Sequence, residues 1–269
     1  MSQPTNIVSG LPNLGNTCFM NSALQMCSTL NLLVDLQHPL HAFFVTMRAG
    51  KPADPRIPRM YVMKKYANFR NTAQHDSHEW VLALLDTIEY DQKNIKEITD
   101  GIFDVSVAFV GCGHVSRHEE PFRVLSLDLP RPGGTLEDAY MTFASPVVVQ
   151  CACVDDCKST VVKRAIKTMQ IKSVPPILII HWKRFEFVHR SRVGKKVEQR
   201  VKVPLTWRGY RLTGFVNHRG RTPSAGHYTA CIHRNGQWYL ISDSSVTPIL
   251  ERHAIKAAEA AYMLSFQKI

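Results

Sequence analysis

The sequence has no long hydrophobic run, and this absence removes integral membrane proteins with helical spans from consideration. No apolar stretch in the 269 residues approaches the ~18 residues that a helix needs to cross a bilayer. The first residues, Met-Ser-Gln-Pro-Thr-Asn, lack the basic and then apolar order of a secretory signal. Internal repeats and low-complexity tracts are also missing. We therefore expect a globular chain, built as one large domain or two small ones.

The chain also has few acidic residues compared with its basic ones, and its number of cysteines is odd. The chain has 22 acidic against 33 basic residues, a net charge of +11, and seven dispersed cysteines. An odd number of scattered cysteines favours reduced thiols in the cytoplasm or nucleus over a disulfide framework. The positive charge could attract acidic proteins, nucleic acid or anionic membranes. The signatures of the nucleic-acid-binding modules are absent, so nucleic acid is not an expected partner.

The densest basic stretch runs from residue 183 to residue 202. One interpretation is a solvated hairpin that turns at Val193-Gly194 and pairs residues 185–188 with residues 201–203. The other is a docking surface for an acidic partner or a membrane. The residues alone leave both open.

Hydrophobic periodicity divides the chain into a helical part and a part made mostly of strands, an α+β organisation. The predicted helices span residues 18–33, 40–47, 59–69 and 76–88, with a short capped helix at residues 135–141. The clearest predicted strands span residues 103–109, 124–129 and 177–181.

Cys18 and His227 form the most informative pair of residues. Cys18 follows Asn16 and Thr17, which are good N-cap residues, and starts a predicted helix with one apolar face. A helix N-terminus or a nearby imidazolium lowers a cysteine pKa and so favours the reactive thiolate. His227 lies in a predicted strand far along the chain. A single cysteine or histidine is usually structural, but the two together are the halves of a thiol nucleophile.

Five ordered motifs resemble the conserved boxes of the ubiquitin-specific proteases, which are papain-like cysteine isopeptidases. They cover the chain from about Gly10 to its last predicted strand, and they are Asn13–Ser22, Gln74–Trp80, His181–Phe185, Gly226–Ala230 and Trp238–Val246. The resemblance implies one catalytic domain over 1–269 with little room for insertions. Its parts would be a helical thumb (about 1–100), β fingers with the start of the palm (about 101–175), and a β-rich palm (about 176–269).

The resemblance also assigns roles near Cys18 and His227. It points to Asn13, with the Cys18 backbone N–H, as the oxyanion donors, whereas Asn16 would cap the helix or hold the loop. The family usually has Asp or Asn four residues after the tryptophan of its last box, to orient the histidine. Here that residue is Ser242, followed by Asp243.

The strand register favours Ser242 as the orienting residue. Asn235-Gly236 predicts a two-residue type I′ turn that pairs Arg234 with Gln237. Side chains alternate along a strand, so this register puts Ser242 on the face of His227 and turns Asp243 away. A hydroxyl carries no charge, but a cysteine needs this help less than a serine does, so we expect activity.

The same resemblance implies a binding channel for the basic, glycine-ended tail of ubiquitin. Asp76 and Glu79, at the start of a predicted helix, would contact this tail, although acidic residues there also complement the helix dipole. Phe185, Phe187 and Tyr228 would form the walls of the channel, or simply belong to the core.

Family members often hold a structural zinc through two Cys-x-x-Cys pairs in the fingers, and neither pair is intact here. Phe109 and Val154 stand where the first cysteine of each pair would be. The cysteines at positions 112, 151, 153 and 157 could still form a tetrahedral site. His114 or His118 could replace one of them, and free thiols from a decayed site are the alternative. The predicted metal ligands are Cys112, Cys151, Cys153 and Cys157.

The sequence thus predicts a deubiquitinase that hydrolyses the bond after the terminal glycine of ubiquitin through a thioester, without a catalytic cofactor. A ubiquitin-binding scaffold weakened by Ser242, or a protease for a ubiquitin-like modifier, are the alternatives. Ubiquitin and ubiquitinated proteins are the expected partners.

Overall fold

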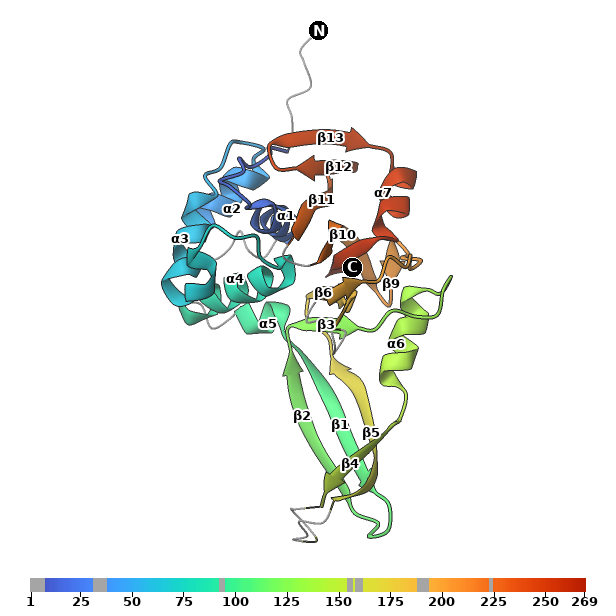
Figure 1. The fold of residues 1–269 in the computed structure, drawn as a ribbon. Helices are drawn as coiled ribbons and strands as arrows, with labels where there is room; N and C mark the ends of the chain where they lie inside the picture. Colours follow the sequence, from blue (N-terminus) through green and yellow to red (C-terminus); the bar gives the residue numbers. More distant parts are fainter. Residues whose placement is uncertain are drawn as a thin grey trace.

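Helices form the first third of the chain and strands most of the rest, and the two parts meet along helix α1 (Cys18–Cys27) (Figure 1). The computed structural model describes residues 8–30, 38–91, 95–153, 157, 162–187, 194–222 and 225–269. No helix among them is long and apolar enough to span a membrane. The remaining helical elements are α2 (His41–Arg48), α3 (Arg56–Lys65), the 3₁₀ turn η2 (Ala67–Arg70), α4 (Ser77–Asp91), α5 (Ile95–Thr99), α6 (Leu136–Ala144) and α7 (Glu251–Ala258).

The predicted helices at residues 40–47, 76–88 and 135–141 match α2, α4 and α6 to within three residues, and the other two differ more. The first ends at Cys27, and the predicted residues 31–33 lie outside the described part. The third starts at Arg56, before Pro58, and gives way to η2 after Lys65. Proline is tolerated in the first turn of a helix, where its missing N–H has no intrahelical partner, so Pro58 does not delay the start.

The main sheet is the scaffold against which α1 packs. Its strands follow the order β13-β12-β11-β10-β14-β6-β3, with β9 beside β10, and the β3–β6 pair is parallel. These strands are β3 (Val124–Leu127), β6 (Ile177–Trp182), β9 (Thr206–Trp207), β10 (Tyr210–Thr222), β11 (Ala225–Arg234), β12 (Gln237–Ser242), β13 (Ser245–Ile249) and β14 (Ala261–Lys268).

All ten residues of α1 are buried, although its sequence suggested one buried face. The helix lies between α4 on one side and β11 on the other, so no face is left for solvent. A core on this side of the sheet includes Leu24, Trp80 and Tyr228. A second core lies under α6 and α7 and includes Trp182, Phe215 and Trp238. The start of α1 is therefore held rigidly against the sheet.

A second, four-stranded antiparallel sheet projects from the rest of the molecule as an arm (Figure 1). Its order is β2-β1-β5-β4. The strands are β1 (Gly101–Phe109), β2 (Val115–Phe122), β4 (Val147–Ala152) and β5 (Val162–Ser173).

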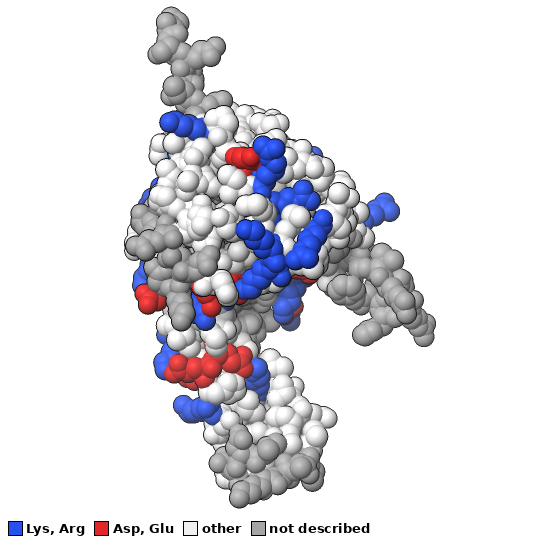
Figure 2. Space-filling model, turned by 90° about the vertical axis from the view of Figure 1, so that its left-hand side faces the viewer, with Lys and Arg blue, Asp and Glu red and all other residues white. Residues whose placement is uncertain are grey.

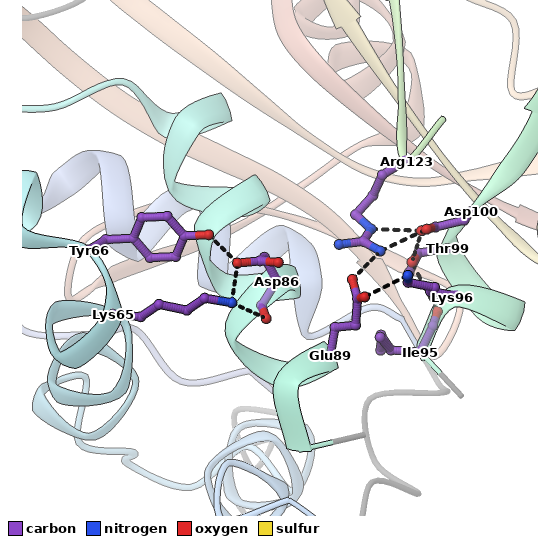
Figure 3. A network of polar contacts seen from close by, with 9 residues as sticks. All are labelled: Lys65, Tyr66, Asp86, Glu89, Ile95, Lys96, Thr99, Asp100 and Arg123. Carbon is purple, nitrogen blue, oxygen red and sulfur yellow. Dashed lines mark hydrogen bonds and ion pairs between the residues drawn. The ribbon is translucent and has the colours of Figure 1, made fainter. Parts of the chain in front are cut away.

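Arg123 links this arm to the helical part (Figure 3). It follows β2, and its guanidinium donates to Asp100 at 2.7 Å and to Glu89 of α4 at 2.8 Å. Lys96 of α5 pairs with the other oxygen of Glu89 at 2.8 Å. The three elements meet in one network of charges.

The predicted hairpin in the basic segment has a different partner strand. β7 (Phe185–Phe187) pairs with β8 (Gly194–Lys196), not with residues 201–203. Val201 and Val203 lie in the core under α6 and α7. They are two residues apart, so in an extended segment their side chains point to the same side.

Two cations of the basic segment serve the fold. Arg184 is 1% exposed and donates to the carbonyls of Ala261 and Gln199, among others. Lys196 is buried and pairs with Glu198.

Candidate active site

Cys18 is the first residue of α1, and the loop before it is ordered by Asn13. The Asn13 Oδ1 accepts from the backbone N–H of Gly15 at 3.0 Å and of Thr17 at 3.1 Å. Asn16 has φ 55° and donates from its side chain to the Thr72 carbonyl at 3.0 Å, so it holds the loop and does not cap the helix. The Cys18 side chain is 3% exposed. The thiol therefore lies at a helix N-terminus, where unpaired N–H groups favour negative charge.

His227 and Ser242 are in contact, as the strand register predicts. The turn pairs Arg234 with Gln237 and continues regularly to Ala230 opposite Ile241. Beyond these pairs, the Nε2 of His227 lies 2.8 Å from the Ser242 Oγ. When Ser242 accepts from an Nε2–H, the Nδ1 of His227 carries the lone pair and is the nitrogen able to accept a proton.

Gln74 joins the cysteine and histidine sides of the site. Its Nε2 donates to the Cys18 Sγ at 3.0 Å and to the Gly226 carbonyl at 2.6 Å. Its Oε1 accepts from the Gly226 N–H at 2.8 Å. Gln74 begins one of the five sequence motifs, which assign it no role. One signal in the sequence could have suggested this role. The Gln74 amide is both donor and acceptor, and it comes two residues before Asp76, which caps a helix.

Gly226 can make this contact because it lacks a side chain. Its φ is 153°, and a Cβ there would lie 2.2 Å from the Arg219 carbonyl oxygen and 2.6 Å from the His218 Nε2. Any other residue would move the start of β11 and with it His227.

Asp243 contacts the cysteine loop instead of His227. Its two carboxylate oxygens accept from the side-chain amides of Asn13 at 2.9 Å and Asn21 at 2.7 Å. Asp243 has φ 51°, and its carbonyl accepts from the Leu11 N–H at 2.9 Å. Asn13 uses one amide hydrogen on Asp243 and keeps the second for another acceptor.

Asp76 and Glu79 line a pocket of about 290 Å³ with Phe185 and Tyr262. Asp76 caps α4, because its Oδ1 accepts from the N–H groups of His78 at 2.6 Å and Glu79 at 3.1 Å. Its other oxygen accepts from the Tyr262 hydroxyl at 2.5 Å. Burial, and then the Asp76 charge, raise the pKa of Glu79. Lys183 and Arg184 also line this pocket, which therefore combines two carboxylates, two basic residues and aromatic walls.

The other two predicted wall residues are placed differently. Tyr228 is 1% exposed and packs in the core beside His218, with ring centres 4.4 Å apart. The side chain of Phe187 lies outside the described part of the chain.

Two further cysteines lie in the core, Cys27 at the end of α1 and Cys231 in β11. Burial raises the pKa of both Cys27 and Cys231 to about 12. Thiols of this kind stay protonated and unreactive at neutral pH.

Comparison with known proteins gives the family. The model of the ubiquitin carboxyl-terminal hydrolase family matches residues 9–266. The chain belongs to this family. It is 30% identical over 312 residues to ubiquitin carboxyl-terminal hydrolase 23 of Arabidopsis thaliana, covering 97% of this chain and 35% of that protein. Ubiquitin carboxyl-terminal hydrolase 3 of Homo sapiens is 26% identical over 363 residues, covering 96% of this chain and 67% of that protein. The chain thus spans about a third of the first relative's length.

Solved structures agree with a ubiquitin carboxyl-terminal hydrolase fold. A SAGA DUB module, Ubp8/Sgf11/Sus1/Sgf73 bound to ubiquitin aldehyde, matches with a TM-score of 0.78 and 22% identity, over 100% of this chain and 71% of that chain. The same module bound to monoubiquitin matches with a TM-score of 0.77 and 24% identity, over the same shares. The predicted papain-like α+β fold is confirmed.

At the tip of the arm, this member of the family has a cluster of cysteine and histidine side chains. Ligand atoms of Cys112, His114, Cys153 and Cys157 all lie within 4.8 Å of one another. The His114 Nδ1 is 2.9 Å from the Cys157 Sγ. Three thiols and an imidazole at this spacing could bind a metal ion.

Cys151 was predicted as a ligand and is not part of this cluster. It lies within β4, in the ladder opposite Lys163, whereas Cys153 follows the end of that strand. His114, named as a possible substitute, takes its place, and His118 pairs with Glu120 at 2.8 Å.

Proposed function

We propose that the chain is a thiol-dependent deubiquitinase that hydrolyses the bond after the C-terminal glycine of ubiquitin. One observation carries the proposal: Cys18 and His227 each have a defined hydrogen-bond partner, Gln74 and Ser242, in a chain of the ubiquitin carboxyl-terminal hydrolase family. The contact between Ser242 and His227 also argues against an inactive scaffold, because the orienting position is filled by a group that can accept from the imidazole.

In the proposed reaction, the Nδ1 of His227 takes the proton of Cys18, and the thiolate sulfur attacks the carbonyl carbon of the terminal glycine. The oxyanion accepts from the free amide hydrogen of Asn13 and from the Cys18 N–H. His227 then gives its proton to the leaving amine as the C–N bond breaks, which leaves a thioester. Water, deprotonated by His227, attacks the thioester and releases the ubiquitin carboxylate and the thiol.

We assign the pocket at Asp76 and Glu79 to the basic tail of ubiquitin. The two carboxylates and the aromatic wall of Phe185 support this assignment. Phe187 and Tyr228 remain predicted channel residues.

We also propose the division into thumb, fingers and palm; the helical part, the arm and the main sheet support it. We further propose that Cys112, His114, Cys153 and Cys157 hold a structural zinc ion, because three thiolates and an imidazole are a common donor set for it.

The cysteines also bear on the location of the protein. None of the seven, all of them in the described part of the chain, forms a disulfide, and this supports a cytoplasmic or nuclear location.

Reaction with ubiquitin carrying a C-terminal electrophile tests the proposal, with probes made from ubiquitin-like modifiers alongside. Covalent labelling by ubiquitin and weaker labelling by the relatives is the expected result. Binding of ubiquitin without labelling would favour the scaffold, and preferred labelling by a relative would identify a different modifier.

A further inference from the structure

Helix α3 presents a basic face to solvent on the side of the molecule farthest from α7 (Figure 1). Arg56, Arg59, Met60, Met63 and Lys64 follow the helical spacing i, i+3, i+4, i+7 and i+8, so they share one face. Pro58 and Val62 are the buried residues of the opposite face. Met60, at the middle of this face, is 47% exposed and adds an apolar side chain to the cations around it.

This face borders a shallow groove of about 450 Å³, and Arg70 completes its lining. Lys and Arg side chains gather at the centre of this side of the molecule, with few acidic groups among them (Figure 2). Asp54 neutralises Arg56 at 2.8 Å. Among the described residues, no carboxylate pairs with Arg59, Lys64 or Arg70. The groove is therefore cationic and has two flexible methionines in its floor.

The groove lies close to the candidate nucleophile. Arg59 donates to the Asn71 carbonyl at 3.3 Å, and Gln74 of the same segment contacts Cys18. Four residues separate Arg70 from Gln74, so their Cα atoms are at most roughly 15 Å apart. A protein that is joined to ubiquitin through a lysine has its scissile bond at Cys18. Such a protein is wide enough to reach the groove, since even a 100-residue domain has a radius of gyration of about 13 Å.

The two surfaces beside this segment differ in charge. Asp76 and Glu79 give the pocket assigned to the ubiquitin tail two carboxylates beside its basic residues Lys183 and Arg184, whereas the charged residues that line the groove are all basic. An acidic partner therefore fits the groove better than the pocket. Because the ubiquitin tail occupies one side of the scissile bond, the groove is left for the other side.

We propose that the α3 groove binds an acidic segment with an apolar side chain, belonging to the protein from which ubiquitin is removed. This inference rests on the proposed deubiquitinase activity. The cations attract the acidic residues, and Met60 and Met63 receive the apolar one. The interaction selects among conjugates and does not take part in the chemistry at Cys18.

The test compares three substrates: ubiquitin joined through an isopeptide bond to an acidic, leucine-containing peptide, the same with a neutral peptide, and ubiquitin with a small fluorescent leaving group. The groove variant is Met60→Ser with Lys64→Glu. The matched control is Arg252→Glu with Lys256→Glu on α7, which introduces at least as large a change of charge on exposed residues.

We expect kcat/KM for the acidic conjugate to exceed that for the neutral one about three- to tenfold at about 50 mM salt, and less at about 300 mM. The groove variant should bring this ratio to about one, while the α7 control keeps it. Hydrolysis of the small-leaving-group substrate should be the same in all three proteins. Equal rates on both conjugates, or a preference that survives in the groove variant, would overturn the proposal.

Two further measurements separate the possible failures. If the small-leaving-group substrate is not cleaved, the proposed function has failed, and fluorescence anisotropy with the labelled acidic peptide then tests the groove by itself. Sedimentation with anionic phosphatidylserine vesicles tests a membrane instead. Vesicle binding that is lost in the groove variant, without peptide binding, would replace the protein partner by a lipid surface.

Discussion

The active site and the arm are built in different ways from the same chain. At the active site, Cys18, His227, Asn13 and Asp243 come from distant parts of the sequence and are held by hydrogen bonds within a large core. At the tip of the arm, a small core formed mainly by Phe109 and Ala165 lies beside the Cys/His cluster. Several apolar side chains of the arm are exposed, among them Val147, Val148, Val162 and Ile166. Packing maintains the first region, whereas the second has a small core beside the proposed metal site.

The strongest test of this contrast is removal of the nucleophile. Cys18→Ala should lower hydrolysis by at least about 10⁴-fold, as expected when a nucleophile is lost. Ubiquitin binding and thermal stability should change little, since alanine suits the start of a helix. Steady-state kinetics and calorimetry measure the two. Cys27→Ala is the control, and an adduct on Cys27 or Cys231 in place of Cys18 would show that the nucleophile is wrongly assigned.

Gln74 should matter next, because it connects the two sides of the site. Gln74→Glu replaces a donor to the thiolate by a negative charge, so the pKa of the Cys18 thiol should rise and the rate at neutral pH should fall about 10²-fold. Gln74→Met keeps the size, loses the hydrogen bonds and should have a smaller effect. The pH dependence of alkylation of Cys18 reports the thiol pKa. An unchanged profile in both variants would mean that Gln74 only fills space.

Ser242 and Asp243 should differ in the kind of defect they cause. Ser242→Ala should lower kcat about 10–10²-fold, less than the ~10⁴-fold loss of an orienting carboxylate in a serine enzyme. It should also shift the pH–rate profile, since the imidazole loses its partner. Asp243→Ala should lower the rate through Asn13 and leave the profile in place. The opposite pattern would make Asp243 the orienting residue.

The smallest catalytic effect is expected from the cluster on the arm. Chelation, or Cys112→Ser, should lower Tm by about 4–8 °C, equivalent to roughly 2 kcal/mol for a chain of this size. Hydrolysis of a small-leaving-group substrate should fall far less than in the Cys18 variant. Native mass spectrometry counts the metal. A protein without metal, and with the same Tm after chelation, would show that the thiols are remnants of a lost site.

Local patterns predicted much of the site. Asn235-Gly236 determines the turn, the turn determines the register, and the register brings Ser242 to His227. The helix-start pattern suggested Cys18 as the nucleophile and the resemblance suggested Asn13 as an oxyanion donor, and both roles stay predictions. The register inference depends only on period-two alternation and on residues next to one another in the chain.

Other features depend on contacts that no local pattern contains. The role of Gln74 requires β11 to lie beside the segment before α4. The replacement of Cys151 by His114 depends on where β4 ends. The pairing of β7 with β8 depends on which apolar residues enter the core. Strand ends and side-chain bridges follow from tertiary packing, which sequence periodicity does not describe.

The contact between Gly10 and the 243–244 turn has a consequence for how the enzyme is made. A Cβ on Gly10 would lie 2.5 Å from the Ser244 carbonyl, and the neighbouring Leu11 binds Asp243, so the start of the chain fits closely against a turn made more than 230 residues later. Pairings so distant in sequence form late in folding. During synthesis Cys18 emerges long before His227, and before Asp243, which holds the Asn13 amide. We therefore expect the nascent chain to be inactive until these two distant parts of the sequence have come together.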